Sequence, residues 1–136
     1  MKIVHIDSSI AGREATSSIL AKSVVDRLVS GQDAQVHYRD LNQEGLGHLT
    51  DEVFAGFRLD AIERNETQKI AAKRSENYIE ELRDADALVL AVPMYNFSTP
   101  STVKAWIDHV ARAGISFTYG ANGPEGLLNV KKAYVV

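Results

Sequence analysis

Hydroxyl side chains gather in a polar stretch near the N-terminus, between an apolar segment and a segment with helical spacing. The stretch DSSIAGREATS begins directly after residues 2–6 (KIVHI) and supplies Ser9, Thr16 and Ser17, among other hydroxyls. The start of a helix favours an anion through its free N–H groups and its dipole, and hydroxyls add further donors. The pattern predicts a phosphate-binding loop; the alternative is that these hydroxyls only cap the helix.

A second group of special residues follows the apolar run ALVLAV at residues 87–92. The next five residues are Pro93, Met94, Tyr95, Asn96 and Phe97, which include a rigid proline, two aromatic rings and an amide. Together they offer a flat amphipathic surface, an amide and the backbone donors of a turn, which suit a planar polar ring. The alternative is a strand-to-helix turn whose aromatic side chains cover the core.

Several other kinds of chemistry are excluded or disfavoured by composition. The chain has no cysteine, which excludes thiolate catalysis and Cys-ligated metals, and its four histidines lack ligand spacing, so we expect no metal site. Neither G-x-G-x-x-G nor G-x-x-x-x-G-K-[ST] occurs. A net charge of −3 without a basic block favours a small-molecule partner over nucleic acid or a membrane surface. With no signal-peptide pattern, we expect a cytoplasmic location.

Hydrophobic periodicity predicts alternating strands and helices across residues 1–136, which we expect to form a single domain. The predicted strands lie at 2–6, 34–41, 87–92 and from Lys131 onward. The predicted helices run from Ser17 to Gly31, over 51–57, over 66–82 and from Ser101 to Gly114, with Thr16 or Ser17 capping the first and Ser101 the last. Residues 115–128 are expected to form a loop. This order predicts an α/β fold with an open parallel sheet and helices on both faces.

The two special loops follow the first and third strands. In a doubly wound sheet with strand order 2-1-3-4, ligands bind where the winding reverses, between the carboxyl ends of strands 1 and 3. A ligand there has a phosphate at one end and a polar ring at the other, which is the shape of flavin mononucleotide (FMN). Asp7 also suggests a signalling receiver domain, but the third strand ends in Val92 and Pro93, with no aspartate to phosphorylate.

Four motifs in the same order resemble the FMN-dependent NADH azoreductases, also described as FMN-dependent NADH:quinone oxidoreductases. They are MYNF at 94–97, KAWIDHVARAG at 104–114, FTY at 117–119 and NGPEGL at 122–127. The resemblance implies a flavodoxin-like fold, with the FMN phosphate at Ser9, Thr16 and Ser17 and the flavin ring at 93–97. It also implies a homodimer, NADH as the electron donor, quinones and azo compounds as acceptors, and substrate-side roles for Arg58 and Tyr119. No protein side chain need be catalytic, because the flavin carries the chemistry.

Two departures from the family pattern bear on these expectations. Ala15 stands where the family usually has serine, which removes one donor and about 1 kcal/mol of interaction. Family members continue beyond the position of Val136 with a Ser/Gly-rich flavin loop, a helix, a fifth strand and a final helix. The fifth strand is therefore expected to be absent here. Either the chain is a fragment of a longer protein, or another subunit covers the exposed edge of its sheet. The alternative function is a non-catalytic FMN-binding or electron-carrier module.

Overall fold

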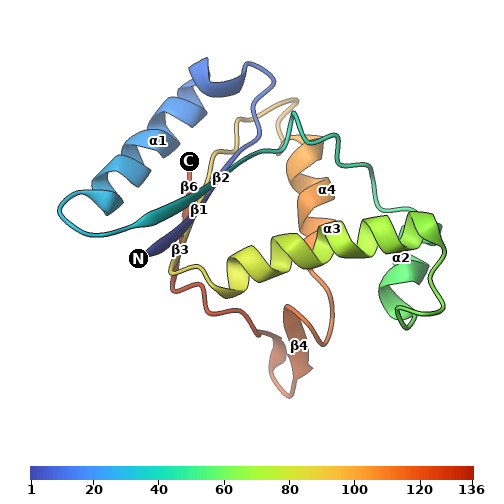
Figure 1. Cartoon of the computed structure of the whole chain (residues 1–136). Coiled ribbons are helices and arrows are strands. Elements are labelled where there is room, and N and C mark those ends of the chain that lie inside the picture. Colours follow the sequence, from blue (N-terminus) through green and yellow to red (C-terminus); the bar gives the residue numbers. More distant parts are fainter.

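The computed structural model describes residues 1–136. Its strands are β1 (Lys2–Asp7), β2 (Gln35–Asp40), β3 (Ala87–Leu90), β4 (Phe117–Gly120), β5 (Gly123–Gly126) and β6 (Lys132–Val135). Its helices are α1 (Thr16–Val29), α2 (Asp51–Arg58), α3 (Glu66–Arg83) and α4 (Ser101–Val110), and a 3₁₀ turn, η1 (Gly12–Glu14), precedes α1. Figure 1 shows α1 on one face of the sheet and α3 and α4 on the other.

The main sheet is parallel throughout, with the order β2-β1-β3-β6. This confirms the predicted α/β fold and its strand order, in which the fourth sheet strand is β6. The edge position of β2 and the central position of β3 follow from their sequences, because β3 is apolar on both faces. The loops that leave β1 and β3 therefore emerge at the same end of neighbouring strands.

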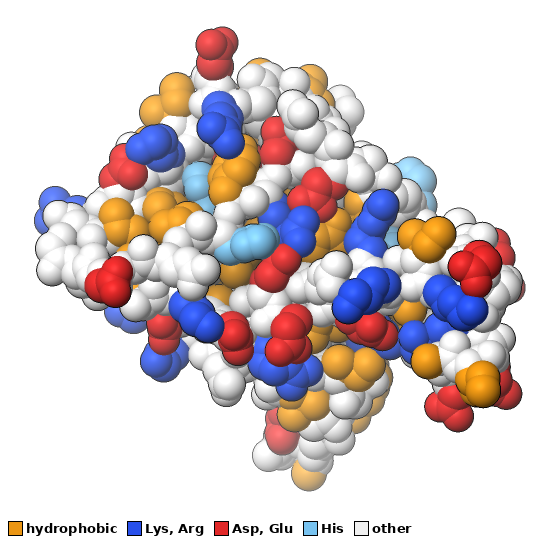
Figure 2. All heavy atoms as spheres, in the orientation of Figure 1, with side chains coloured by type: hydrophobic (Ala, Val, Ile, Leu, Met, Phe, Trp, Pro, Cys, Tyr) orange, Lys and Arg blue, Asp and Glu red, His pale blue; other side chains and the backbone are white.

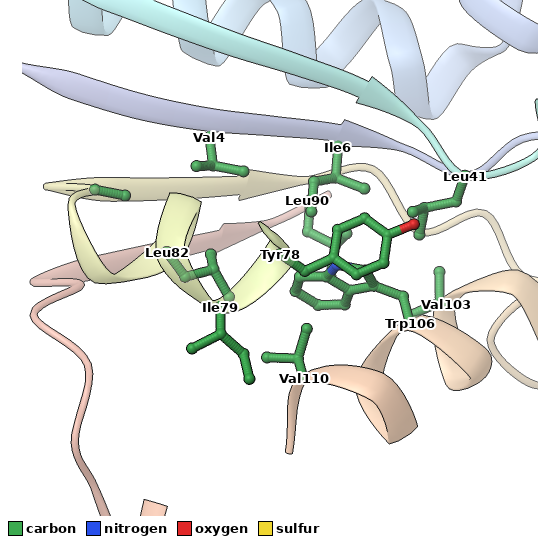
Figure 3. Packing of buried hydrophobic residues seen from close by; sticks show 11 residues of the cluster. Val4, Ile6, Leu41, Tyr78, Ile79, Leu82, Leu90, Val103, Trp106 and Val110 are labelled. Atoms are coloured by element: carbon green, nitrogen blue, oxygen red, sulfur yellow. The ribbon is translucent and has the colours of Figure 1, made fainter. Parts of the chain in front are cut away.

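Large apolar side chains fill the space between the sheet and helices α3 and α4. Figure 3 shows Val4 and Ile6 of β1 above Tyr78 and Ile79 of α3, with Trp106 of α4 beside them. The opposite face of the sheet packs on α1 through smaller side chains, which are Ile3, Ala21, Val25, Ala87, Val89 and Ala91. Alternation along β1 sends successive side chains to the two faces, so one strand contributes to both clusters.

The long helix α3 begins at the predicted residue, Glu66, and ends one residue beyond the predicted Leu82; a complete capping box stabilises its start. The side chain of Asn65 accepts from the Gln68 amide, and the Gln68 side chain accepts from the Asn65 amide. Basic and acidic side chains are interspersed over the face that carries α3 (Figure 2). Two i,i+3 ion pairs there join Lys69 to Glu66 and Arg83 to Glu80. No helix has the length and hydropathy needed to cross a membrane.

Three details of the predicted elements are wrong. Residues Phe117–Gly120 and Gly123–Gly126 form an antiparallel hairpin instead of a loop, because backbone pairing overrides the weak strand propensity of GPEG. The predicted caps lie inside their helices, since α1 is preceded by Ala15 and α4 by Pro100, neither with a side-chain cap. Gly114 does not end α4, which stops at Val110, although Gly114 has the positive φ of a turn residue.

Candidate functional site

The loops that follow β1 and β3 are joined by hydrogen bonds. Ser9 Oγ and Tyr95 OH lie 3.1 Å apart, and the Ile10 amide donates to the same phenol oxygen at 3.2 Å. Below this junction, buried Ser8 donates through Oγ to the Ala91 carbonyl at 2.6 Å. The structure therefore brings together the two loops that the sequence singles out, and it fixes their spacing through side-chain bonds.

The start of α1 has donors that no group of the protein satisfies. Its N-cap is Ala15, which has no side chain able to accept from the first turn. The amides of Thr16, Ser17 and Ser18 therefore lack both an intrahelical acceptor and a side-chain cap. Ser17 Oγ is buried without a hydrogen-bond partner, while Thr16 is exposed. These groups fit a phosphate, which accepts hydrogen bonds and is favoured by the helix dipole.

The loop after β3 contains a tight turn with an unusual backbone. Asn96 and Phe97 have φ angles of 49° and 63°, and the residues that flank them, Tyr95 and Ser98, exchange backbone hydrogen bonds of 2.9 and 3.0 Å. Two consecutive positive φ angles define a type I′ turn, and a bulky residue such as phenylalanine is strained there. Phe97 is 97% exposed, so burial does not offset this strain. Backbone strain of this kind concentrates at ligand-binding sites.

A groove separates the strained turn from the loop after β1. It is lined by Ile10, Met94, Tyr95, Asn96, Ser98, Thr99, Pro100 and Ser101. Met94 is 74% exposed beside it, and Pro93 lies half-buried at the end of β3. The groove includes Ile10 and Tyr95 of the junction, and a short turn from Ser9 through Gly12 leads into α1, so one elongated ligand can reach both. A flat polar ring fits the groove, and a phosphate fits the helix start.

The whole chain, residues 1–136, matches the family model described as flavodoxin-like fold. A protein of Erythrobacter litoralis named FMN-dependent NADH:quinone oxidoreductase is 47% identical over 133 residues, covering 98% of this chain and 67% of the relative. The chain belongs to the flavodoxin-like family of FMN-dependent NADH:quinone oxidoreductases. It spans about two thirds of the length of this relative. The resemblance drawn from the MYNF and KAWIDHVARAG motifs is thereby confirmed.

Two solved azoreductase structures have the same fold as this chain. The azoreductase of Bacillus anthracis superposes with a TM-score of 0.82 at 22% identity, covering 99% of this chain and 67% of that chain. An FMN-dependent NADH-azoreductase of Bacillus anthracis, solved in complex with FMN, superposes with a TM-score of 0.79 at 15% identity, covering 98% and 67%. At these identities the similarity concerns the fold.

The two predicted substrate residues, Arg58 and Tyr119, lie apart from the Ser9–Tyr95 junction. Arg58 ends α2, with its guanidinium carbon 5.9 Å from the centre of the Phe54 ring. Tyr119 is an exposed residue of β4 whose ring contacts Phe117 edge to face at 5.3 Å. No hydrogen bond, ion pair or ring contact links either residue to the loops after β1 and β3. In Figure 1 the β4 hairpin projects from the end of the molecule opposite those loops.

Sequence reasoning missed two features of this site. The amide of Ile10 takes part in the junction, and its side chain lines the groove although it is apolar and exposed. An exposed isoleucine directly after two serines was the available signal. The contact of Tyr95 with Ser9 was also missed, because it depends on how two loops distant in the sequence are placed.

Proposed function

We propose that this chain binds FMN and transfers two electrons from NADH to quinones or azo compounds. Membership of the oxidoreductase family supports this function. The observation that carries it is the unpartnered Ser17 hydroxyl at an uncapped helix start, next to the Ser9–Tyr95 junction and its groove. A phosphate group and a flat ring on one molecule match these two features together.

The residues present support a division of the ligand into two parts. Ser9, Thr16 and Ser17 would hold the phosphate through hydroxyls and through the free amides of the first turn of α1. Residues 93–97 would hold the ring, with Met94 and Tyr95 beside it and the backbone of the Asn96–Phe97 turn at its polar edge. Backbone donors aimed at that edge stabilise negative charge that develops during reduction.

Bound FMN supplies the redox chemistry, taking a hydride from NADH and passing two electrons to the acceptor. The protein's part is to bind, orient and shield. We infer a ping-pong order, in which NADH gives up its hydride and leaves as NAD⁺ before the acceptor enters. The groove beside Met94 and Phe97 offers one open side, and both substrates would use it in turn.

We also infer that the complete site forms in a homodimer. Arg58 and Tyr119 lie away from the loops of their own chain, so a role on the substrate side requires that they come from a second copy. Both are surface residues with flat or extended side chains that suit contact with an aromatic substrate. In this arrangement the second copy would close part of the groove.

The function is tested by mixing the purified chain with FMN, desalting it, and following NADH oxidation with a soluble benzoquinone. We expect retained flavin absorption bands and quinone-dependent turnover. Retained flavin without NADH oxidation would overturn the enzymatic function and leave a carrier module. A colourless protein would overturn FMN binding by this chain.

A further inference from the structure

A polar pocket lies between α1, β1 and β2, on the face of the sheet opposite α3 and α4. It has a volume of about 400 Å³ and is lined by His5, Asp7, Arg13, Ser18, Ile19, Lys22, Ser23 and Tyr38. None of these residues lines the groove after β3, and only the backbone amide of Ser18, not its side chain, belongs to the proposed phosphate site. The pocket is therefore a separate feature of the α1 face.

The base of the pocket holds buried polar atoms that lack partners. Asp7 and Ser18 are each 2% exposed and His5 is 6% exposed, and Asp7 Oδ1, Ser18 Oγ and His5 Nε2 make no hydrogen bond. His5 Nε2 and Asp7 Oδ1 lie 3.2 Å apart, but their geometry is not that of a hydrogen bond. Buried polar groups are almost always paired, so the adjacent His5 and Asp7 atoms and the Ser18 hydroxyl, lining one cavity without a hydrogen bond, indicate a ligand with complementary groups.

The remaining contacts of Asp7 define which group can bind there. Its Oδ2 atom accepts from Tyr38 OH at 2.9 Å, whereas Oδ1 accepts no hydrogen bond, although His5 Nε2 lies 3.2 Å from it. Burial, partly opposed by the neighbouring Asp7, lowers the pKa of His5 below its ordinary value of 6.5, so this imidazole is mainly neutral at pH 7. A carboxylate in this setting calls for a hydrogen-bond donor, either a hydroxyl or an ammonium group.

The mouth of the pocket has the opposite charge. Arg13 is exposed and stacks over the Tyr38 ring at 4.4 Å, without an ion pair to any carboxylate of the chain. Lys22 is the second cation and forms an i,i+4 pair with Asp26 at 2.6 Å. The cavity thus runs from an acceptor at its base to cations at its rim, and the guanidinium of Arg13 is free to bind a carboxylate in a bidentate way.

We propose that this pocket binds a small organic carboxylate that carries a hydroxyl or ammonium group on the neighbouring carbon. The hydroxyl or ammonium group donates to Asp7 Oδ1, with Ser18 Oγ and His5 Nε2 alongside it. The carboxylate faces Arg13 and Lys22. A metal ion does not fit, because no cluster of three or more histidine or acidic side chains exists. Inorganic phosphate does not fit either, because its oxygens would face the Asp7 carboxylate.

The proposal is tested with a matched set of three-carbon probes by NMR titration of the ¹⁵N-labelled chain. L-Lactate and L-alanine carry the donor as hydroxyl or ammonium, and propionate lacks it. We expect lactate or alanine to shift the amides around Asp7, Ser18 and Tyr38, and propionate to bind at least about tenfold more weakly. Whichever of lactate and alanine binds more tightly identifies the donor.

Variants separate specific binding from general effects. Arg13→Gln changes an exposed side chain, should leave folding intact, and should weaken probe binding by about tenfold. Arg27→Gln, in the last turn of α1, is the matched control and should bind as the wild type does. Ser18→Ala should also weaken probe binding, because it removes the hydroxyl while changing the side-chain volume little.

Three results would overturn the proposal. They are equal binding of propionate, shifts centred outside the pocket, and no shifts with any probe, which would mean that the cavity holds only water. An FMN titration on the same samples keeps this test distinct from that of the proposed function. FMN binding with no probe binding contradicts only the pocket proposal.

Discussion

The two faces of the sheet are built from different kinds of residue. The face toward α3 and α4 packs against large helix side chains such as Tyr78, Ile79 and Trp106, in one cluster of eleven buried residues. The face toward α1 contains six smaller apolar residues and, at its upper end, the buried polar groups of His5 and Asp7. Because burial free energy follows apolar area, the first face contributes more to stability. The second face can then carry polar groups and an uncapped helix start.

The alternation of β1 makes this difference possible. Val4 and Ile6 point to the large cluster, whereas Ile3, His5 and Asp7 point toward α1. The same strand therefore anchors the fold on one side and places polar groups on the other. The candidate functional groups of the α1 face therefore lie where packing is lightest.

The largest expected effect comes from matched core substitutions on the two faces. Isoleucine-to-alanine changes in protein cores cost about 2–5 kcal/mol, depending on how far the surroundings collapse into the cavity. We expect Ile79→Ala to fall in the upper half of that range, because large side chains from two helices surround it. Ile3→Ala should fall near the lower end, because α1 is a single helix over small residues. Urea denaturation measures the loss of unfolding free energy in each variant. An equal or larger loss in Ile3→Ala would contradict the difference in packing between the two faces.

The next effect concerns the bond between the two loops. Tyr95→Phe removes the hydroxyl that contacts Ser9 Oγ and the Ile10 amide, which should lower the free energy of unfolding by about 1 kcal/mol. Hydrogen exchange at the Ile10 amide should become faster. Tyr119→Phe is the matched control, since the Tyr119 hydroxyl makes no hydrogen bond, and it should leave stability unchanged. Unchanged exchange at Ile10 in Tyr95→Phe would argue against the junction.

A stabilising substitution is expected at the strained turn. Phe97→Gly relieves the positive φ of an exposed phenylalanine and should raise the free energy of unfolding by up to about 1 kcal/mol. Asn96→Gly should gain less, because asparagine tolerates this backbone region better. The same Phe97→Gly variant should bind FMN less tightly. A variant that is both less stable and an equal FMN binder would contradict a functional origin of the strain.

The smallest effect is a pH dependence from the α1 face. Burial, partly opposed by Asp7, lowers the pKa of His5 below its ordinary 6.5. The unfolded chain therefore binds a proton at this site more readily than the folded chain, and stability is lost as the pH falls below 6.5. We expect His5→Gln to lose less stability than the wild type between pH 7.5 and 5.5 in urea denaturation. His48→Gln, at an exposed site, should follow the wild type, and identical pH profiles for His5→Gln would refute this assignment.

The sequence predicted the main sheet and its helices because their signals are local. The apolar residues 87–92 marked a central strand, and the helical spacing of apolar residues over 66–82 marked α3. The β4–β5 hairpin was missed because GPEG has no strand propensity, and its pairing with FTYG is formed across a turn. Phosphate-binding, ring-binding and substrate roles of individual residues remain predictions.

Contacts between distant segments could not be predicted in the same way. The α1-face pocket depends on the register of β1 and β2, in which His5 pairs with Tyr38 and Asp7 with Asp40. A shift by one residue would turn Tyr38 to the other face of the sheet. The Ser9–Tyr95 contact likewise depends on side-chain placement between two loops, which no local pattern encodes.

The most direct test of the central claim is an equilibrium titration of the chain with FMN, followed by flavin fluorescence, for the wild type, Ser17→Ala and Ser30→Ala. Ser17 Oγ is a buried hydroxyl without a partner in the first turn of α1, and Ser30 is an exposed serine at the other end of that helix. The predicted result is saturable binding that is weakened about tenfold by Ser17→Ala and unchanged by Ser30→Ala. Absence of saturable binding, or equal affinity in all three proteins, would contradict an FMN site at the loops after β1 and β3.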